Sequence, residues 1–273
     1  MANRLALAGM ALVLGLALTA ALFYRQNPVT TGAADYAQTL AATAGGTYVT
    51  LRTLNAVLSI GQEVELGGSA VVASATVQPL KVLEPVDDTI ERIAGVVFAI
   101  MLAAGVLSVA MAPVGAVGAA MVVLAVVSWA VERAWGQGGP YASPARKLAW
   151  YGGFLGLGLP LSFLLAATVA DSLTAHVWAE HDAILTEIMA QVDTQTGITP
   201  TLADQGSWIQ AMRETLGEAG RYQALAQTVF ERADELIASF IAILSVYVFQ
   251  LFLLPCLIVG AVYLIVRHFA ARA

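Results

Sequence analysis

Residues 93–131, IAGVVFAIMLAAGVLSVAMAPVGAVGAAMVVLAVVSWAV, decide the fold because these 39 residues contain no charged side chain. A transmembrane helix needs about 20 apolar residues, so this stretch is too long for one straight span. The proline and glycine of residues 112–115, APVG, predict a break in it. We therefore expect residues 114–131 to cross the bilayer, and residues 93–111 to form a re-entrant, an interfacial or a further spanning helix.

Three other apolar runs are long enough to cross a bilayer: residues 5–24, 148–170 and 237–266. Hydrophobic residues make up 59% of the 273-residue chain. Charged residues make up 12%, which is half of the roughly 25% found in soluble domains. These features predict an all-α membrane protein with about four transmembrane helices, organised as a single membrane domain over residues 1–273.

Two acidic segments, residues 28–92 and 171–236, are too polar to span and are expected to lie outside the bilayer as helical extensions. Residues 28–32 are expected to break the chain before the first of these helices. Residues 70–83, AVVASATVQPLKVL, alternate and are rich in valine, so a short extended segment is expected there.

The helix of residues 148–170 has no breaker at its end, so it is predicted to continue past Asp171 as one rod. The same reasoning predicts that the last spanning helix begins outside the bilayer. Pro160 predicts a kink. The buried stripe beyond Asp171 is expected to consist of apolar residues at helical spacing, namely Leu173, Val177, Ile184, Ile188 and Val192.

The distribution of charge predicts the topology. Arg4, the net basic loop 132–147 and the tail with Arg267 and Arg272 are expected on the cytoplasmic side. Both acidic segments then lie on the periplasmic side of a bacterial inner membrane, with both termini in the cytoplasm. A five-span alternative places the basic tail outside and separates the two acidic segments, so four spans are preferred.

Few residues suggest chemistry. His176 and Glu180 are spaced i, i+4 on one helical face, which is compatible with a metal ligand pair, but an interfacial polar face explains them as well. Gln250 lies within the last span, where an amide requires a partner, so it is a candidate for a helix contact or a pore lining. Gly152 and Gly156 form a GxxxG pair that permits close helix contact.

No catalytic or nucleotide-binding motif is present, so no cofactor is expected, and the absence of a basic stripe argues against nucleic acid as a partner. The expected partners are the lipid bilayer and either further copies of the chain or another membrane protein.

Residues 81–92, KVLEPVDDTIER, with the apolar helix that follows, resemble a segment of uncharacterised bacterial multi-pass inner-membrane proteins. The layout of four spans with two outer segments is also similar to eukaryotic four-pass large-pore channels. The chain departs from several of those channels because it lacks their paired outer cysteines and contains only Cys256.

The leading functional expectation is a non-enzymatic membrane protein that self-associates, with a channel or pore as one form of the assembly. The alternative is an accessory or assembly subunit that docks onto a larger membrane complex. A weaker alternative is a membrane-bound metalloenzyme that uses His176 and Glu180.

Overall fold

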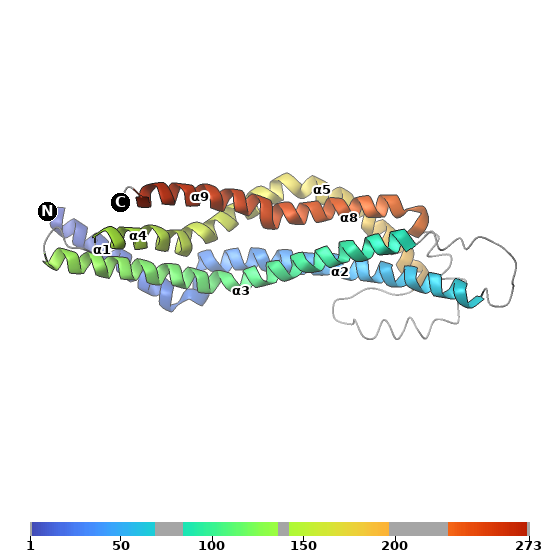
Figure 1. Cartoon of the computed structure of the whole chain (residues 1–273), viewed down its shortest axis with the longest axis horizontal. Helices are drawn as coiled ribbons and strands as arrows, with labels where there is room; N and C mark the ends of the chain where they lie inside the picture. The colour runs from blue at the N-terminus through green and yellow to red at the C-terminus, as the bar shows by residue number, and fades with distance from the viewer. Residues whose placement is uncertain (1, 69–83, 136–141, 197–228, 272–273) are drawn as a thin grey trace. The chain divides into compact units, whose positions relative to one another are not determined.

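The computed structural model describes residues 2–68, 84–135, 142–196 and 229–271, and these residues are helical almost throughout. The elements in chain order are α1 (Ala2–Leu22), η1 (Tyr24–Gln26), α2 (Pro28–Gly68), α3 (Glu84–Trp135), α4 (Ala142–Gly153), η4 (Phe154–Gly158), α5 (Leu159–Thr196), α8 (Ala233–Val248), η6 (Phe249–Leu253) and α9 (Leu254–Ala271) (Figure 1). The prediction of an all-α fold is confirmed. The extended segment predicted at 70–83 lies outside the described residues, as do residues 197–228.

Three helical stretches are long and apolar enough to cross a membrane: Glu84–Arg133, Pro144–Gln191 and Ala233–Ala271. A shorter apolar helix covers Ala8–Leu22, within the first predicted span. The long stretches each include one of the other predicted spans together with a polar extension. The rod predicted beyond Asp171 is confirmed, because α5 continues through Asp171 to Thr196.

The break predicted at residues 112–115 is wrong, because α3 continues through Pro113 from Glu84 to Trp135. The small residues that follow the proline serve packing instead. A Cβ atom on Gly115 would lie 2.5 Å from the Cγ2 atom of Thr30, so this glycine lets α2 approach α3 closely. Residues 93–111 are therefore part of one uninterrupted helix and not a separate re-entrant element.

The break expected at residues 28–32 is replaced by the start of α2 at Pro28, which the preceding residue, Asn27, caps. Asn27 has extended backbone angles, and its side-chain oxygen accepts a hydrogen bond from the amide of Val29 at 3.1 Å. Pro28 occupies the first helical position, where its missing N–H is not needed. Asn-Pro is therefore a capping signal here, and α2 runs unbroken to Gly68.

The helices are grouped into two compact units. Unit 1 consists of Met1–Leu40, Ala103–Ser172 and Phe249–Ala273, and unit 2 of Ala41–Leu102 and Leu173–Val248. The long helices α2, α3 and α5 contribute residues to both units.

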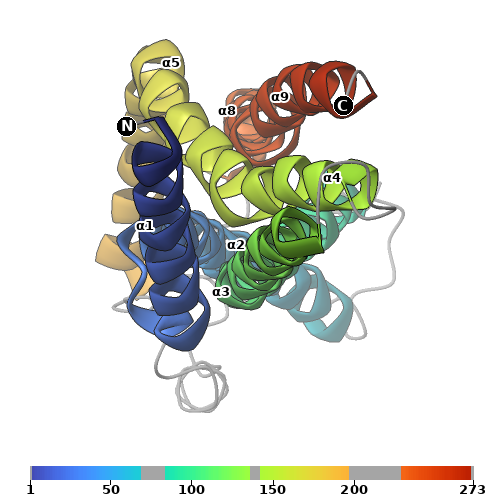
Figure 2. The ribbon, with the colours of Figure 1, turned by 90° about the vertical axis from the view of Figure 1, so that its left-hand side faces the viewer.

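In unit 1, the beginning of α1, the end of α3, the beginning of α4 and the end of α9 lie at the same end (Figure 1). In this unit α1 and α4 therefore run away from this end, whereas α3 and α9 run toward it. Viewed from that end, α4 lies between α3 and α9 (Figure 2). Part of the apolar core of unit 1 consists of Ala33, Met111 and Phe163, one residue from each of three helices.

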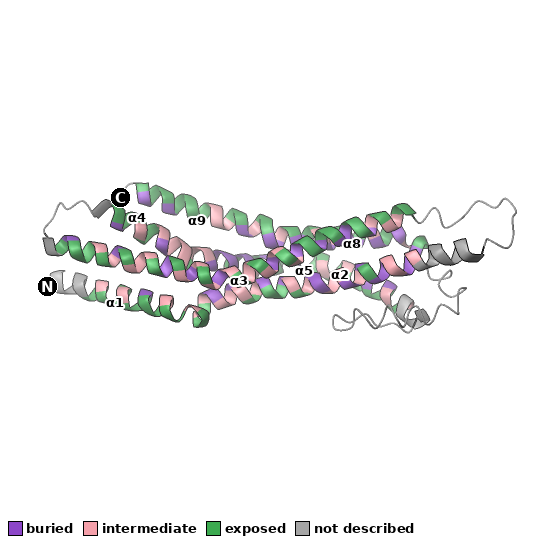
Figure 3. Cartoon of the chain, turned by 60° about the horizontal axis from the view of Figure 1, so that its bottom comes forward, coloured by how far each residue is buried: buried purple, intermediate pink, exposed green. Residues whose placement is uncertain are grey.

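The core of unit 2 is formed by apolar side chains from four helices. Fully buried members are Leu51, Leu54 and Leu58 of α2, Ile90 of α3, Ile188 of α5, and Leu236 and Phe240 of α8. Buried residues recur along one face of each of these helices, whereas exposed residues occupy the other faces (Figure 3). The spacing of three to four residues is that of an amphipathic helix.

The stripe predicted on α5 is partly wrong. Ile188 is buried, but Leu173 and Val177 are exposed, and Ile184 is only half-buried. The face that packs inside unit 2 instead includes Thr174, Leu185 and Ile188. Val192 lies beyond the residues whose side chains the structure describes. Apolar side chains therefore occupy more than one face of α5, and the sequence pattern does not distinguish the face that packs within the chain.

Candidate functional site

The structure places the predicted metal ligands His176 and Glu180 on the exposed surface of α5. No group of three His, Cys, Asp or Glu residues that could hold a metal ion occurs in the part of the chain that the structure describes. The neighbouring His181 is directed elsewhere, since its Nδ1 atom lies 3.2 Å from the hydroxyl oxygen of Ser239 on α8. The pair is thus compatible with the polar helix face that the sequence also suggested.

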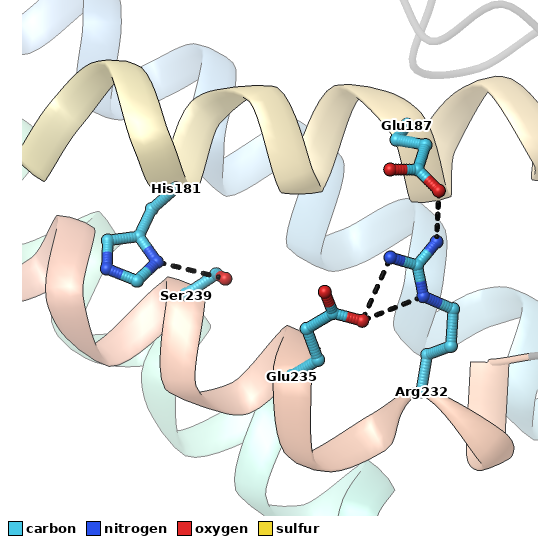
Figure 4. A network of polar contacts seen from close by, with 5 residues as sticks. All are labelled: His181, Glu187, Arg232, Glu235 and Ser239. Carbon is cyan, nitrogen blue, oxygen red and sulfur yellow. Dashed lines mark hydrogen bonds and ion pairs between the residues drawn. The ribbon is translucent and has the colours of Figure 1, made fainter.

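A polar network that sequence reasoning did not identify joins α5 to the start of α8 in unit 2 (Figure 4). The guanidinium of Arg232 donates to Glu187 of α5 at 2.9 Å and to Glu235 of α8, also at 2.9 Å. Hydrogen bonding to Glu235 raises the pKa of Arg232, and the same bond lowers the pKa of Glu235. Because both carboxylates are exposed, the network contributes little to the free energy of unfolding.

A second contact in unit 2 joins α2, α5 and α8 through Tyr247. Its hydroxyl lies 2.8 Å from the hydroxyl of Thr47, and its ring meets the edge of Trp178 at a centroid distance of 5.4 Å. A cavity of about 420 Å³ lies in the same unit and is lined by threonines, Asp182 and apolar side chains. Among the described residues that line it there is no cysteine, serine, histidine or lysine.

Gly152 and Gly156 form a helix contact within the chain. A Cβ atom on Gly118 of α3 would meet the amide nitrogen of Gly156 and would lie 2.6 Å from its Cα atom. A Cβ atom on Gly152 would lie 2.8 Å from the carbonyl oxygen of Gly118. We call these three residues the glycine seam. The seam brings the backbones of α3 and α4–η4 into direct contact, so both members of the GxxxG pair serve packing inside unit 1.

Gln250 is buried in unit 1, within the π-helical segment η6. Its main-chain carbonyl oxygen accepts a hydrogen bond from the hydroxyl of Tyr36 at 3.3 Å, which joins α2 to the last helical rod. A buried amide avoids the cost of facing lipid.

Two π-helical segments share one sequence pattern in unit 1. Residues 154–160, FLGLGLP, and residues 249–255, FQLFLLP, each form a five-residue π segment followed by Leu-Pro. Proline cannot donate to the carbonyl four residues earlier and its ring crowds that carbonyl, so the preceding turn widens. The Pro160 signal was identified from the sequence, whereas the equivalent role of Pro255 was missed.

These two segments border an apolar groove of about 580 Å³ in unit 1. Residues of α3, η4, α5, η6 and α9 line it, and Cys256 is exposed in it. A volume of this size is within the range of sites for small molecules, roughly 300–1,000 Å³. We refer to this feature as the π-segment groove.

No protein family model, no curated protein and no solved structure matches this chain.

Proposed function

We propose that this protein is a non-enzymatic integral membrane protein that self-associates through exposed apolar side chains of unit 2. The uncharged stretch of α3, 39 residues from 93 to 131, rises about 58 Å as an unbroken helix. To remain within a hydrocarbon core of about 30 Å it would have to tilt by about 60°, whereas transmembrane helices tilt by 0–40°. Part of this apolar helix must therefore lie outside the hydrocarbon.

The basic ends of the helices indicate which part this is. The basic residues Arg133, at the end of α3, and Lys147, in α4, mark the cytoplasmic edge of the bilayer. A span of about 20 residues from this edge covers α3 from Val131 back to about residue 110, and the α4–α5 helix up to about Ala170. These residues belong to unit 1, so we assign the membrane to unit 1 and the aqueous side to unit 2. The beginning of α1, the end of α3, the beginning of α4 and the end of α9 lie at one end of unit 1. This arrangement supports four crossings, with that end in the cytoplasm of a bacterial cell.

One observation carries the proposal of self-association. Unit 2 exposes large apolar side chains on several helices, including Leu102 of α3 at 57%, Leu173 of α5 at 61% and Ile241 of α8 at 49%. By the count above, Leu102 and Leu173 lie beyond the hydrocarbon core. Burying one such side chain contributes about 1.5–3 kcal/mol, which favours covering these faces with a second copy of the chain.

The test compares two substitutions on the same helix. Leu173→Asp is expected to shift the purified protein in detergent from an oligomer to a monomer by light scattering, with little change in Tm because the side chain is exposed. Thr186→Asp adds the same charge at an exposed polar position and should leave the oligomer intact. A monomeric wild-type protein would contradict self-association and would favour docking onto a different membrane protein.

A further inference from the structure

The π-segment groove has no role in self-association through unit 2, and its lining suggests a different ligand. It is formed by apolar side chains, among them Met111, Phe154, Phe163 and Val259, with Gly260 and Tyr263 on the α9 side. All of these residues belong to unit 1, which carries the segments that we place in the bilayer. At this depth the surrounding medium is hydrocarbon, so an apolar groove favours an acyl chain over a water-soluble ligand.

The groove and the part of α9 that continues from it to Arg267 together have the length of one leaflet. Cys256, Gly260, Tyr263 and Arg267 follow one another at spacings of four, three and four residues, which places them on one face of α9. The eleven residue steps from Cys256 to Arg267 rise about 16 Å, close to half of a hydrocarbon core of about 30 Å. An acyl chain with its end at Cys256 would therefore place its headgroup near Arg267.

Cations and aromatic rings mark the headgroup end on both walls. Lys147 precedes Phe154 by seven residues, so both lie on the same face of the α4 rod. Lys147 and Arg267 are exposed, and neither forms an ion pair with any residue that the structure describes. Trp150, which lies between Lys147 and Phe154 in the sequence, stacks on Phe269 of α9 with ring centroids 5.4 Å apart, as expected for residues at headgroup level.

We propose that the π-segment groove binds one phospholipid, with an acyl chain between η4 and α9 and an anionic headgroup beside Lys147 and Arg267. The cations complement a negative phosphate group, and the uncharged groove excludes the headgroup from the interior. The site is contained in one copy of the chain and does not depend on the proposed oligomer.

The glycines of the two rods provide a matched pair of variants. A Cβ atom on Gly260 would meet nothing within 4 Å, so Gly260→Leu fills the groove without a clash against the backbone. Gly153 has the same free space but does not line the groove, so Gly153→Leu is the control. The charge test is Lys147→Gln with Arg267→Gln, and its control is Arg52→Gln with Arg92→Gln, two exposed cations of unit 2.

Native mass spectrometry of the full-length protein in a neutral detergent, titrated with phosphatidylglycerol or phosphatidylcholine of equal chain length, measures the bound lipid. We expect one phosphatidylglycerol per wild-type chain, loss of it in Gly260→Leu, and retention in Gly153→Leu. The Lys147/Arg267 variant should bind phosphatidylglycerol about tenfold more weakly and lose the preference over phosphatidylcholine, whereas the Arg52/Arg92 variant should not. Wild-type binding in Gly260→Leu, or an unchanged preference in the Lys147/Arg267 variant, would overturn the proposal.

Cys256 provides a second measurement that needs no variant, since it is the only cysteine in the chain. Phosphatidylglycerol is expected to slow its alkylation by N-ethylmaleimide, and phosphatidylcholine to slow it less. Equal alkylation rates with and without lipid would contradict the proposal. Efficient linkage of Cys256 between two copies by a short bis-maleimide would also contradict it, because a second chain and not a lipid would then cover the groove. Neither result would affect self-association through Leu173.

Discussion

At the scale of single residues, glycines decide how closely the helices of unit 1 approach. In the glycine seam the backbone of α3 lies directly against that of α4–η4, and no space remains for a methyl group on Gly118. Elsewhere on α3, a methyl group on Gly105 would have nothing within 4 Å, so the missing side chain has no packing role there. The two positions therefore separate the effect of packing from the effect of helix propensity.

We expect Gly118→Ala to lower the Tm of the detergent-solubilised protein, because the methyl group forces the helices apart at a cost of about 1–3 kcal/mol. Gly105→Ala should be neutral or stabilising by up to about 1 kcal/mol, since alanine favours a helix more than glycine does. Differential scanning fluorimetry of both variants measures the difference. Equal Tm values would show that the seam can open without cost.

Asp87, in the first turn of α3, has a raised pKa because of burial first, and then because of Glu91 and Asp88, while a hydrogen bond from Ser59 opposes the shift. Its Oδ1 atom is buried and has no hydrogen-bond partner among the described residues. The folded chain therefore binds this proton more tightly than the unfolded chain. Stability at this site rises as pH falls through the folded pKa, and the ionised form is destabilising at neutral pH.

Asp87→Asn should accordingly raise the Tm at pH 7 and reduce its change as pH falls from neutral toward 3.8, the unshifted value. Asp88→Asn, at the adjacent exposed position, should change the Tm little. Thermal scans at several pH values between these limits provide the measurement. A lower Tm for Asp87→Asn at pH 7 would mean that the ionised carboxylate is stabilising in its site.

For Gln250, the contact with Tyr36 uses the main-chain carbonyl, so Gln250→Leu leaves that bond in place. Because side-chain hydrogen bonds in membranes average about 0.6 kcal/mol, we expect a small change in Tm and no change in dye flux through proteoliposomes. Tyr36→Phe, which removes the contact itself, is the comparison. Altered flux in Gln250→Leu at an unchanged Tm would instead show that the amide lines a pore.

At the scale of helices, the sequence predicted that the segments are helical better than it predicted where each helix begins and ends. The all-α fold and the extension past Asp171 followed from apolar periodicity and from the absence of breakers. Pro113 was misread because proline and glycine usually end helices in water. In an apolar environment the remaining helical hydrogen bonds meet no competition from solvent, and neighbouring helices accommodate the proline, so α3 continues.

Hydrophobicity also could not show which face of a helix packs inside the chain. Leu173 and Val177 are as apolar as Leu185, yet the first two are exposed and Leu185 is buried. Positions that contact lipid or a partner favour apolar side chains, as core positions do. Only the positions of the other helices therefore distinguish a side chain buried within the chain from an exposed one. The Arg232 network was missed for a related reason, because Glu187 lies 45 residues away in the sequence.

At the scale of the whole molecule, the proposed topology gives a direct prediction. In a Cys256→Ser background, a cysteine at Glu84, the exposed start of α3, should react with a membrane-impermeant maleimide on intact cells after the outer membrane is made permeable. A cysteine at Pro144, exposed near the start of α4, should react only after lysis. Reaction of both positions on intact cells would exclude the four-span arrangement.

The two π segments have a consequence for how this chain tolerates changes in length. A π-helical turn contains one more residue than an α-helical turn. Each of the segments Phe154–Gly158 and Phe249–Leu253 is therefore equivalent to an α-helical turn with one inserted residue. Removing one residue from 154–158 or from 249–253 would restore a regular turn while leaving the flanking helices in register. Elsewhere in the same rods, a one-residue deletion would rotate everything after it by about 100°. Natural length variation within these rods is thus expected to concentrate at two short segments, each directly before a Leu-Pro pair.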